Sequence, residues 1–220
     1  MALALGVAQF GCGGAKPDAG APATDAGHAP KASRNAAADK RPVIVAFGDS
    51  LTAGFGAEGN SYADYLQKDL DRAGLRWRVV NAGVSGDTTT DGVNRLSEVL
   101  EHKPAVVILE FGGNDGLRGL PLETTQANLD RMVVALRGSG ASVLLAGMTL
   151  PPNYGPEYIH GFEQIYSKLA AKYKLARIPF LLEGVALDRG LMQRDGMHPT
   201  AKGNERVAET VMKYLRPLLR

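Results

Sequence analysis

Cysteine is almost absent from this chain, and its scarcity limits the chemistry available. Among the 220 residues only Cys12 is a cysteine, so no disulfide can form within the chain and no cysteine-based metal cluster can assemble. Histidines are also few, namely His28, His102, His160 and His198. None of them stands in a His-Glu-x-x-His pattern or a comparable ligand spacing, so the sequence predicts no metal site.

A run of basic residues and a long apolar segment are also missing. The formal net charge is only +2, which argues against an extended surface for nucleic acid. No apolar stretch approaches the ~20 residues that a membrane-spanning helix needs. Hydrophobic residues make up 45% of the chain and charged residues 22%, as in a soluble globular protein, and 220 residues suggest one domain with an appendage.

The first 41 residues differ in composition from the rest. Residues 1–10 are apolar and are followed by Gly11-Cys12-Gly13, whereas residues 15–41 are rich in Ala, Pro, Asp and Gly, which predicts a disordered tether. Residues 1–14 resemble a bacterial lipoprotein leader, in which Cys12 would be lipidated after cleavage. That resemblance implies an exported protein, periplasmic or anchored to a membrane through Cys12.

This leader departs from the usual pattern, and a second interpretation stays open. No Lys or Arg precedes the apolar residues, and Gln9 stands where such leaders usually have Leu. In the alternative, residues 1–41 are an ordinary disordered tail of a cytoplasmic protein, and Cys12 is a thiol without a role.

From residue 42 to residue 220, apolar strands alternate with amphipathic helices, which predicts a single α/β domain. A capping box of Ser61 and Asp64 marks the start of the first long helix. Repeated strand–helix units require parallel strands with right-handed crossovers. We expect a three-layer sandwich whose five-stranded parallel sheet has the flavodoxin-like order 2-1-3-4-5. The expected strands are 43–47, 77–81, 105–111, 142–146 and 178–182, and the expected helices include 90–101, 157–173 and 201–215.

Polar residues that suit acyl chemistry follow the predicted strands. Ser50 comes directly after the first strand, and such sheets bind their ligands outside the carboxyl ends of the strands. A serine is a weak nucleophile unless a base takes its proton and a third group orients that base. His198 is the expected base, and Asp195, three residues earlier, can hold its imidazole. Such a triad is recognised by the roles of its members and not by their order in the chain.

Acyl transfer also requires hydrogen-bond donors for the negative charge that develops on the carbonyl oxygen. We expect these donors to be the main-chain N–H groups of Ser50 and Gly83 and the side-chain amide of Asn114. Each motif alone is weak evidence, because Gly, Asn, Asp and Ser are also common in turns. Their joint occurrence, in order and at strand ends, favours a nucleophile, a base and an oxyanion hole.

These residues stand in four blocks that resemble those of the SGNH (GDSL) hydrolase superfamily. The blocks are Gly48-Asp49-Ser50-Leu51, Gly83, Gly113-Asn114-Asp115 and Asp195-x-x-His198, and their order fits from Pro42 to the C-terminus. Residues 152–155 and 195–199 resemble the thioesterase I / lysophospholipase L1 and arylesterase branch. The resemblance implies the SGNH fold, with Ser50 as nucleophile, Asp195 and His198 as its triad partners, and Gly83 and Asn114 in the oxyanion hole.

The expected activity is hydrolysis of carboxylic esters through an acyl-enzyme, with thioesters and lysophospholipids as further substrate classes. This mechanism needs no metal or cofactor, and we expect a monomer whose partner is a small acyl substrate. The loop 148–162 either lines an acyl pocket or only packs over the sheet edge, and both interpretations stay open. In the first case the residues that contact substrate are Leu150, Pro152, Tyr154 and Tyr158.

Other interpretations use the same residues. Residues 54–59 match the dinucleotide fingerprint Gly-x-Gly-x-x-Gly, but they do not directly follow the first strand, and the second strand ends in Asn81 instead of an acid. Ser50 also lacks the Gly-x-Ser-x-Gly elbow of α/β-hydrolases. An acyltransferase or carbohydrate deacetylase would use the same triad, and a catalytically idle SGNH domain would serve as a binding module.

Overall fold

The computed structural model describes residues 39–219. The predicted leader (1–14) with Cys12, and the predicted tether up to residue 38, lie outside the described residues. Contacts within the chain group the residues from Lys40 onward into one unit. In this part of the chain, no helix combines the length and the apolar composition needed to cross a membrane.

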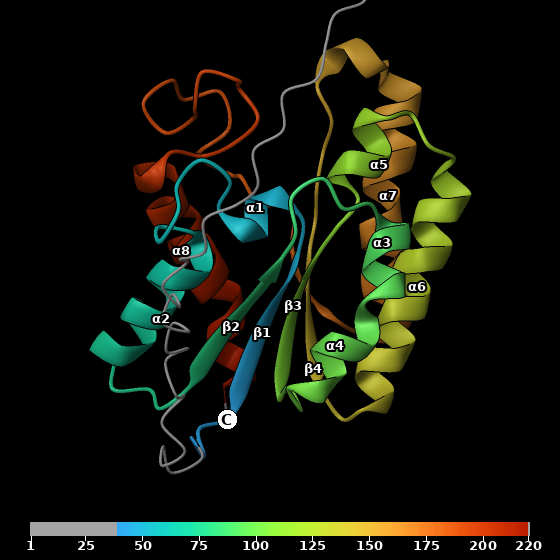
Figure 1. Ribbon diagram of the computed structural model, residues 1–220. Helices are drawn as coiled ribbons and strands as arrows, with labels where there is room; N and C mark the ends of the chain where they lie inside the picture. The colour runs from blue at the N-terminus through green and yellow to red at the C-terminus, as the bar shows by residue number, and fades with distance from the viewer. Residues whose placement is uncertain (1–38, 220) are drawn as a thin grey trace, which may run out of the picture. The chain divides into compact units, whose positions relative to one another are not determined.

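Five parallel strands form one sheet in the order β2-β1-β3-β4-β5, which is the predicted flavodoxin-like order (Figure 1). The register aligns Gly48 with Gly83 on one side and with Glu110 on the other. The residues that follow these three strands therefore meet at one edge of the sheet. The strands are β1 (Val43–Gly48), β2 (Arg78–Gly83), β3 (Val106–Glu110), β4 (Ser142–Ala146) and β5 (Ala176–Ile178).

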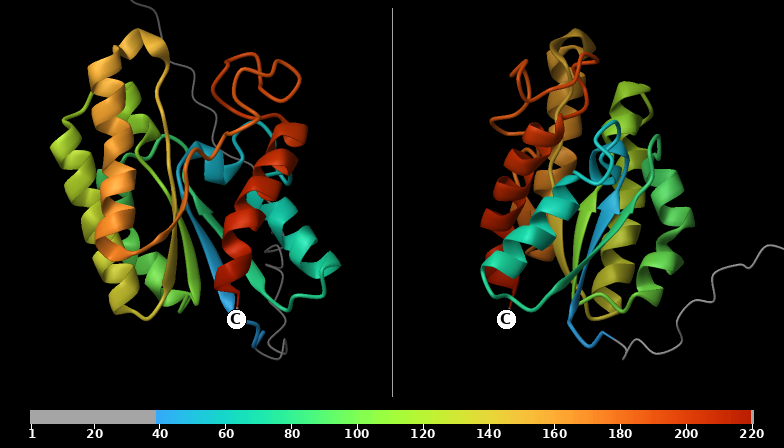
Figure 2. Two further views of the ribbon diagram at one scale, coloured as in Figure 1. Left: turned by 180° about the vertical axis from the view of Figure 1, so that it is seen from behind. Right: turned by 60° about the vertical axis from the view of Figure 1, so that its left-hand side comes forward.

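Helices cover both faces of the sheet and complete the three predicted layers. They are α1 (Ser50–Ala53), α2 (Tyr62–Arg72), α3 (Thr89–Asn94), α4 (Leu96–Glu101), α5 (Gly113–Leu117), α6 (Leu122–Gly138), α7 (Pro156–Tyr173) and α8 (Ala201–Leu215), with short 3-10 turns η1 (Pro152–Tyr154) and η2 (Arg216–Leu218). Helices α2 and α8 pack together on one face, and α3, α4, α6 and α7 cover the other (Figures 1 and 2).

The capping box predicted for α2 is confirmed. The Ser61 hydroxyl accepts the Asp64 N–H at 3.2 Å, and the Asp64 carboxylate accepts the Ser61 N–H at 2.8 Å. Two N–H groups that a helix start leaves unbonded are thereby satisfied. Behind this cap, Tyr62, Leu66 and Leu70 lie on one face of α2 and are fully buried.

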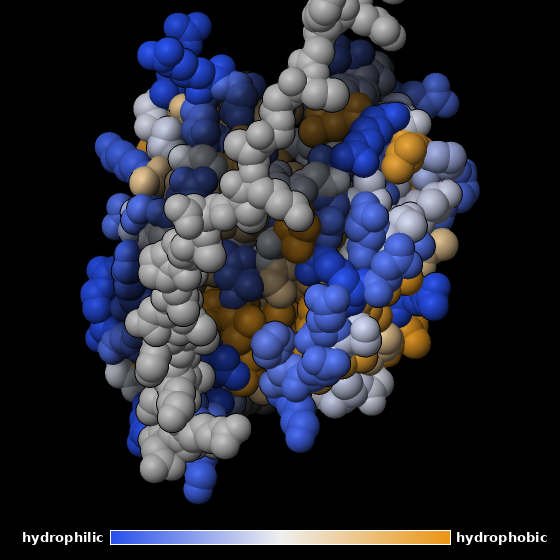
Figure 3. Space-filling view, in the orientation of Figure 1, coloured by the Kyte–Doolittle hydropathy of each residue, from blue (hydrophilic) through white to orange (hydrophobic). Residues whose placement is uncertain are grey.

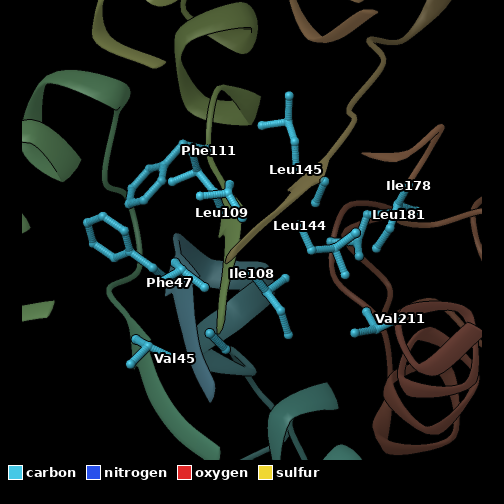
Figure 4. Packing of buried hydrophobic residues seen from close by; sticks show 14 of the residues in the cluster. Val45, Phe47, Ile108, Leu109, Phe111, Leu144, Leu145, Ile178, Leu181 and Val211 are labelled. Carbon is cyan, nitrogen blue, oxygen red and sulfur yellow. The ribbon is translucent and has the colours of Figure 1, made fainter. Parts of the chain in front are cut away.

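The middle strands β1 and β3 are buried on both faces, as their continuous apolar sequences predicted. On one side of the sheet, Phe47 and Phe111 meet edge to face with ring centroids 4.8 Å apart, whereas Val211 of α8 lies on the other side (Figure 4). Full burial of one such side chain contributes about 1.5–3 kcal/mol. The strand ends that carry the site therefore stand on a well-packed core.

Strand β2 lies at the edge of the sheet, and its side chains are mostly half-buried. Apolar atoms gather over this strand on the face seen in Figure 3. The outward N–H groups of an edge strand need partners from outside the ladder. Asn81 supplies one of them, because its Oδ1 accepts the Gly83 N–H at 2.9 Å.

The predicted limits of two elements are wrong. The helix expected over 90–101 is broken at Arg95, which ends α3 and begins α4 with a backbone outside the helical region. The last strand ends at Ile178 and does not extend to residue 182, because Pro179 has no N–H for the ladder. The short helices α1 and α5 were not predicted.

Candidate active site

Ser50 is the first residue of α1, just beyond the carboxyl end of β1. Asp49 forms the turn between them as the N-cap, and its Oδ1 accepts the Leu51 N–H at 3.0 Å. Only glycine fits at position 48, because a Cβ there would collide with Thr52 and Glu110. The Ser50 N–H belongs to the unbonded group of a helix start, and it has no acceptor among residues 39–219.

The Ser50 hydroxyl meets the imidazole of His198, with Oγ and Nε2 2.9 Å apart. On the other side of the ring, Nδ1 lies 2.7 Å from Oδ2 of Asp195. An ionised carboxylate can only accept, so Nδ1 carries the proton and Nε2 is free to accept one from Ser50. The structure thus brings together the three residues of the expected triad, on α1 and on the loop before α8 (Figure 1).

Asp195 is fixed by its own loop. Its Oδ1 accepts the N–H groups of Met197 at 2.9 Å and of His198 at 3.0 Å. Burial raises the pKa of this carboxyl, but hydrogen bonds with His198 and Met197 outweigh burial and lower the pKa to about 2. Asp195 is therefore ionised at neutral pH, as an orienting group must be.

The glycine-rich segment 54–59 forms a wall beside the triad. The ring of Phe55 lies 4.7 Å from the imidazole of His198. Gln193 ties this segment to the loop of His198, because its Nε2 donates to the carbonyl groups of Phe55 at 2.7 Å and Pro199 at 2.9 Å. The next long helix starts only at Tyr62, so the context of a dinucleotide fingerprint is missing here.

Asn114 enters the site from α5, directly after β3. Its Nδ2 donates to the carbonyl oxygen of Asp87 at 2.9 Å and to Oδ2 of Asp49 at 3.1 Å. These two bonds fix the amide beside Ser50 in the same cavity. Both hydrogens of the Asn114 amide are therefore already bonded. To bind this amide, an oxyanion must share one of the two hydrogens with its present acceptor or replace that acceptor.

The placement of Gly83 in the oxyanion hole was wrong. Its N–H is directed away from β1 and is bonded to Asn81 at 2.9 Å, whereas the N–H of the next residue, Val84, bonds to Gly48 of β1. Gly83 does not line the cavity that contains Ser50. Its lack of a side chain serves packing, because a Cβ there would collide with the backbone of Ala53 in α1.

Gly86, which the sequence analysis did not single out, occupies the position that Gly83 was expected to fill. It lines the cavity together with Ser50 and Asn114, in a backbone conformation with φ of 88° that favours glycine. Its N–H has no acceptor in the described part of the chain, and its carbonyl oxygen accepts from Arg118 at 2.9 Å. The sequence does contain a turn signal at residues 85–87. Turn propensity alone, however, gives no reason to prefer Gly86 to Gly83 as an oxyanion donor.

A partly buried arginine, Arg95, connects the loops of the site. The Arg95 guanidinium donates to the carbonyl groups of Ala82 at 2.7 Å and Gly48 at 2.8 Å, and it pairs with Asp87 at 2.5 Å. The same group lies 4.7 Å from the ring centroid of Phe47. Arg95 therefore links the end of β1 to the loop that carries Gly86.

A cavity of about 510 Å³ opens beside Ser50. Its size suits a small-molecule site, and its lining is mainly apolar but includes Ser50, Asn114 and His198. Leu150 and Pro152 line it, as one of the two sequence interpretations expected. Met148, at the start of the same loop, also lines it. The apolar residues that sequence reasoning missed come mostly from irregular segments, namely Phe55, Leu117, Phe180, Leu182, Leu187, Met192 and Met197.

Tyr154 and Tyr158 do not line this cavity, so their expected contact with substrate is wrong. The Tyr154 hydroxyl donates to the carbonyl oxygen of Leu117 at 2.7 Å, and that of Tyr158 donates to Leu120 at 2.9 Å. Their rings stack with centroids 6.5 Å apart. Tyr154 thus connects η1 to the end of α5, and Tyr158 connects the start of α7 to the segment between α5 and α6. This is the packing role of the second interpretation.

Two acidic side chains are buried beneath the nucleophile turn. Asp49 is 2% exposed and Glu110 is fully buried. Burial raises the pKa of Asp49 to about 6, although hydrogen bonds from Leu51 N–H and from the carboxyl of Glu110 oppose the rise. Burial, together with the nearby charge of Asp49, raises the pKa of Glu110 well above its ordinary value. One site thus holds two carboxyl groups that cannot both lose their protons easily.

The remaining described histidines lie outside the site. His102 is the exposed C-cap residue of α4, and His160 is exposed on α7, 2.6 Å from Gln164. Among residues 39–219, no group of three or more Cys, His, Asp or Glu side chains is placed to hold a metal ion.

Several known proteins resemble this chain in sequence and in fold. The sequence model of the GDSL-like Lipase/Acylhydrolase family matches residues 46–206. The chain is 47% identical over 178 residues to a Pseudomonas aeruginosa protein named esterase TesA, covering 80% of this chain and 89% of that protein. It is 37% identical over 187 residues to the Escherichia coli K12 thioesterase 1/protease 1/lysophospholipase L1, covering 84% and 88%. A crystal structure of TesA superposes with a TM-score of 0.78 at 46% identity, covering 80% of this chain and 99% of that one.

Proposed function

Because this chain belongs to the GDSL-like lipase/acylhydrolase family, it is a serine hydrolase, and we propose that Ser50, His198 and Asp195 perform its acyl transfer. The observation that carries this proposal is the relay of hydrogen bonds from Ser50 to His198 at 2.9 Å and from His198 to Asp195 at 2.7 Å. The relay ends at an apolar cavity, which supports an ester with an apolar acyl chain as the substrate.

In the first half of the reaction, Ser50 Oγ attacks the carbonyl carbon of the ester while His198 Nε2 takes the hydroxyl proton. The imidazolium that forms is stabilised by the ionised Asp195. His198 then gives this proton to the leaving alcohol as the C–O bond breaks, and the acyl group stays on Ser50. In the second half, water attacks the acyl carbon while His198 Nε2 takes one of its protons. His198 then returns this proton to Ser50 Oγ as the bond between the acyl carbon and Oγ breaks and the acid leaves.

The oxyanion of each tetrahedral intermediate needs donors that are free in the resting site. The N–H groups of Ser50 and Gly86 meet this requirement, because neither has an acceptor in the described structure. The Asn114 amide is the third donor, and it must share a hydrogen now bonded to Asp49 or Asp87. Gly86 thus takes the role that the sequence had suggested for Gly83.

The substrate classes follow from the cavity and from the relatives. A relative named esterase and another named thioesterase and lysophospholipase support oxygen esters, thioesters and lysophospholipids as substrates of this chain. These molecules share an acyl chain that would occupy the apolar lining. Each CH₂ group transferred from water into such a lining contributes ≈ 0.8 kcal/mol, or up to about fourfold in kcat/KM.

A panel of p-nitrophenyl esters graded by acyl length tests the proposal. We expect kcat/KM to rise with each added CH₂ until the cavity is filled and then to level off. Ser50→Ala should abolish the burst of p-nitrophenol and the turnover while leaving the circular dichroism spectrum unchanged. Hydrolysis by Ser50→Ala at the wild-type rate would refute the role of Ser50. The same panel repeated with an acyl thioester and a lysophospholipid ranks the three substrate classes.

Export and lipidation at Cys12 form a separate proposal, supported only by the likeness of residues 1–14 to a lipoprotein leader. Expression of the full chain in a bacterium fed radiolabelled palmitate should label the protein, and Cys12→Ser should remove the label and release the protein from the membrane fraction. An unlabelled wild-type chain recovered with its first residues intact would contradict the proposal.

A further inference from the structure

Phe55 is an aromatic residue that contacts the proposed base without being fixed by the core. Its ring centroid lies 4.7 Å from that of the His198 imidazole, with an angle of 43° between the two planes. The residue is 50% exposed, so burial does not hold the ring in this place. Phe55 also stands between Gly54 and Gly56, whose φ values of 77° and 69° belong to the left-handed region that glycine adopts easily. The contact therefore needs support from outside this segment.

Gln193 provides that support through both hydrogens of its side-chain amide. Nε2 donates one hydrogen to the carbonyl oxygen of Phe55 at 2.7 Å and the other to that of Pro199 at 2.9 Å. The main-chain N–H of Gln193 donates to the carbonyl oxygen of His198 at 2.8 Å. One residue thus connects the main chain that carries the Phe55 ring to the main chain that carries the imidazole.

The absence of a side chain at Gly56 leaves room for this amide. A Cβ at position 56 would lie 2.5 Å from Oε1 of Gln193, which is a collision. Gly59 has nearly the same backbone conformation, with φ of 72°, but a Cβ there would meet no atom within 4 Å. Both conformations favour glycine, whereas only position 56 must also accommodate Gln193.

The imidazole of His198 loses one of its two hydrogen bonds halfway through the proposed reaction. In the free enzyme it is held between Asp195, 2.7 Å from Nδ1, and the Ser50 hydroxyl, 2.9 Å from Nε2. Once Ser50 carries the acyl group, its Oγ has no hydrogen left to donate to Nε2. The Asp195 bond and the packing against Phe55 then remain to hold the ring while Nε2 takes a proton from water.

We propose that Gln193 is a positioning residue, which holds the Phe55 ring against His198 and thereby keeps the imidazole aimed at water during hydrolysis of the acyl-enzyme. The inference rests on the proposed function, in which His198 is the base. A swing of the ring about its bond to Asp195 would turn Nε2 away from the acyl carbon. Phe55 opposes this motion, so loss of its contact should slow deacylation more than acylation.

The first experiment needs no substrate. The ring current of Phe55 displaces the NMR signals of nearby protons, including the carbon-bound protons of the His198 imidazole, and His198→Gln assigns these signals by their loss. In the full chain, Phe55→Leu should move them toward the values of a free histidine. Gln193→Met, which has a side chain of similar length but no donor, should move them in the same direction. Unmoved signals in folded Gln193→Met would overturn the proposal, even for a protein that hydrolyses no ester.

The second experiment separates the two halves of the reaction. After rapid mixing with a p-nitrophenyl ester, mass spectrometry of the full chain measures how fast the acyl group appears on Ser50 and how fast it leaves. In Gln193→Met and Phe55→Leu, deacylation should slow by about tenfold, because displaced catalytic groups are costly, whereas acylation should change by less than about twofold. Equal losses in both steps, or a wild-type deacylation rate in Phe55→Leu, would refute the proposal. A wild type that never acquires the acyl group would instead refute the proposed function, and this inference with it.

Two controls match the substitutions. Gln67→Met removes an amide that donates to Asp71 and Trp77 on α2 and before β2, so it should keep wild-type rates in both steps. Gly56→Ala should slow deacylation as Gln193→Met does, because its Cβ displaces the amide. Gly59→Ala introduces the same backbone strain without the collision, and it should keep the wild-type rates.

A double variant tests whether Gln193 acts through Phe55. If it does, the two substitutions are not additive, and Gln193→Met should slow deacylation by less than about twofold when added to Phe55→Leu. Phe55→Tyr keeps a ring and should recover most of the rate lost in Phe55→Leu. Additive losses in the double variant would mean that Gln193 acts through Pro199 instead, which contradicts the proposal. If Gln193→Met does not fold, Gly56→Ala decides, because deacylation as fast as in Gly59→Ala would be equally contrary.

Discussion

The Arg95 guanidinium donates a hydrogen bond to the main-chain carbonyl of Gly48 at 2.8 Å. Gly48 ends β1, two residues before the nucleophile, whereas Arg95 follows the loop that carries Gly86. The same side chain reaches Ala82 in β2 and Asp87 in that loop. The Arg95 side chain thereby sets the distance between two proposed oxyanion donors, the N–H groups of Ser50 and Gly86, although it contacts neither of them.

Arg95→Lys should preserve the charge but lose the fork that binds three acceptors at once. Since small displacements of catalytic groups are costly, we expect kcat to fall by about ten- to a hundredfold with a smaller change in KM. Steady-state kinetics on a short ester would measure this. Arg131→Lys, an exposed position on α6, is the control and should behave as wild type. An unchanged kcat in Arg95→Lys would show that the guanidinium is not needed to keep the two loops at their present distance.

Asn114→Ala should lower kcat by roughly 10²–10³, the usual effect of removing one oxyanion donor. The variant should still fold, because Asn114 lines the cavity and is not part of the packed core. Asn128→Ala removes an amide that bonds to Thr89 and Thr90 instead, and it serves as the matched control. Equal kcat values for both variants would remove Asn114 from the oxyanion hole.

Asp195→Asn should lower kcat by about 10⁴, because an amide no longer stabilises the tautomer with the proton on Nδ1. The pKa of Asp195 is about 2, so its own titration should produce no loss of activity between about pH 4 and pH 8. Kinetics of wild type and variant across this range check both statements. A variant within tenfold of wild type would mean that another group orients His198.

Stability should depend on pH through the buried pair. The pKa of Asp49 is raised to about 6 from 3.8, so the folded state retains a proton that the unfolded state releases. The stabilisation is complete below about pH 3.9 and is lost as the pH rises through about 6, with a slope of about 1.4 kcal/mol per pH unit for each such proton. Urea midpoints measured between these limits should fall with pH in wild type and fall less steeply in Asp49→Asn. A wild-type midpoint that rises over this window would contradict the assignment.

Much of the fold could be predicted because strong local patterns coincide with its elements. The apolar sequences of β1, β3 and β4 and the cap at Ser61 agree with tertiary packing. The observed strand order is the expected one, but it is one of several that right-handed crossovers allow, and the sequence pattern alone does not determine it. The end of β5 was misplaced because apolar Leu181 and Leu182 are buried in turns after Pro179. Periodicity does not distinguish a buried turn from a short strand.

At the site, side chains with distinctive chemistry could be identified, whereas backbone donors could not. Ser50, Asp195 and His198 were recognisable because a nucleophile, a base and an orienting acid need particular side chains. Gly83 ends β2 and Gly86 lies in the turn that follows, and the direction of their N–H groups, which distinguishes them as donors, is not visible in the sequence. The roles of Tyr154 and Gln193 depend on partners far away in the chain, which a local pattern does not contain.

Two walls of the cavity differ in kind. One wall, with Leu182, Leu187, Met192 and Met197, belongs to the same irregular segment that presents Asp195 and His198. The other, with Met148, Leu150 and Pro152, precedes α7 and carries no member of the triad. Substitutions in the first wall that adapt the enzyme to a new acyl length also disturb its base. The second wall is therefore where an engineer, or natural selection, can change substrate range at least cost to turnover.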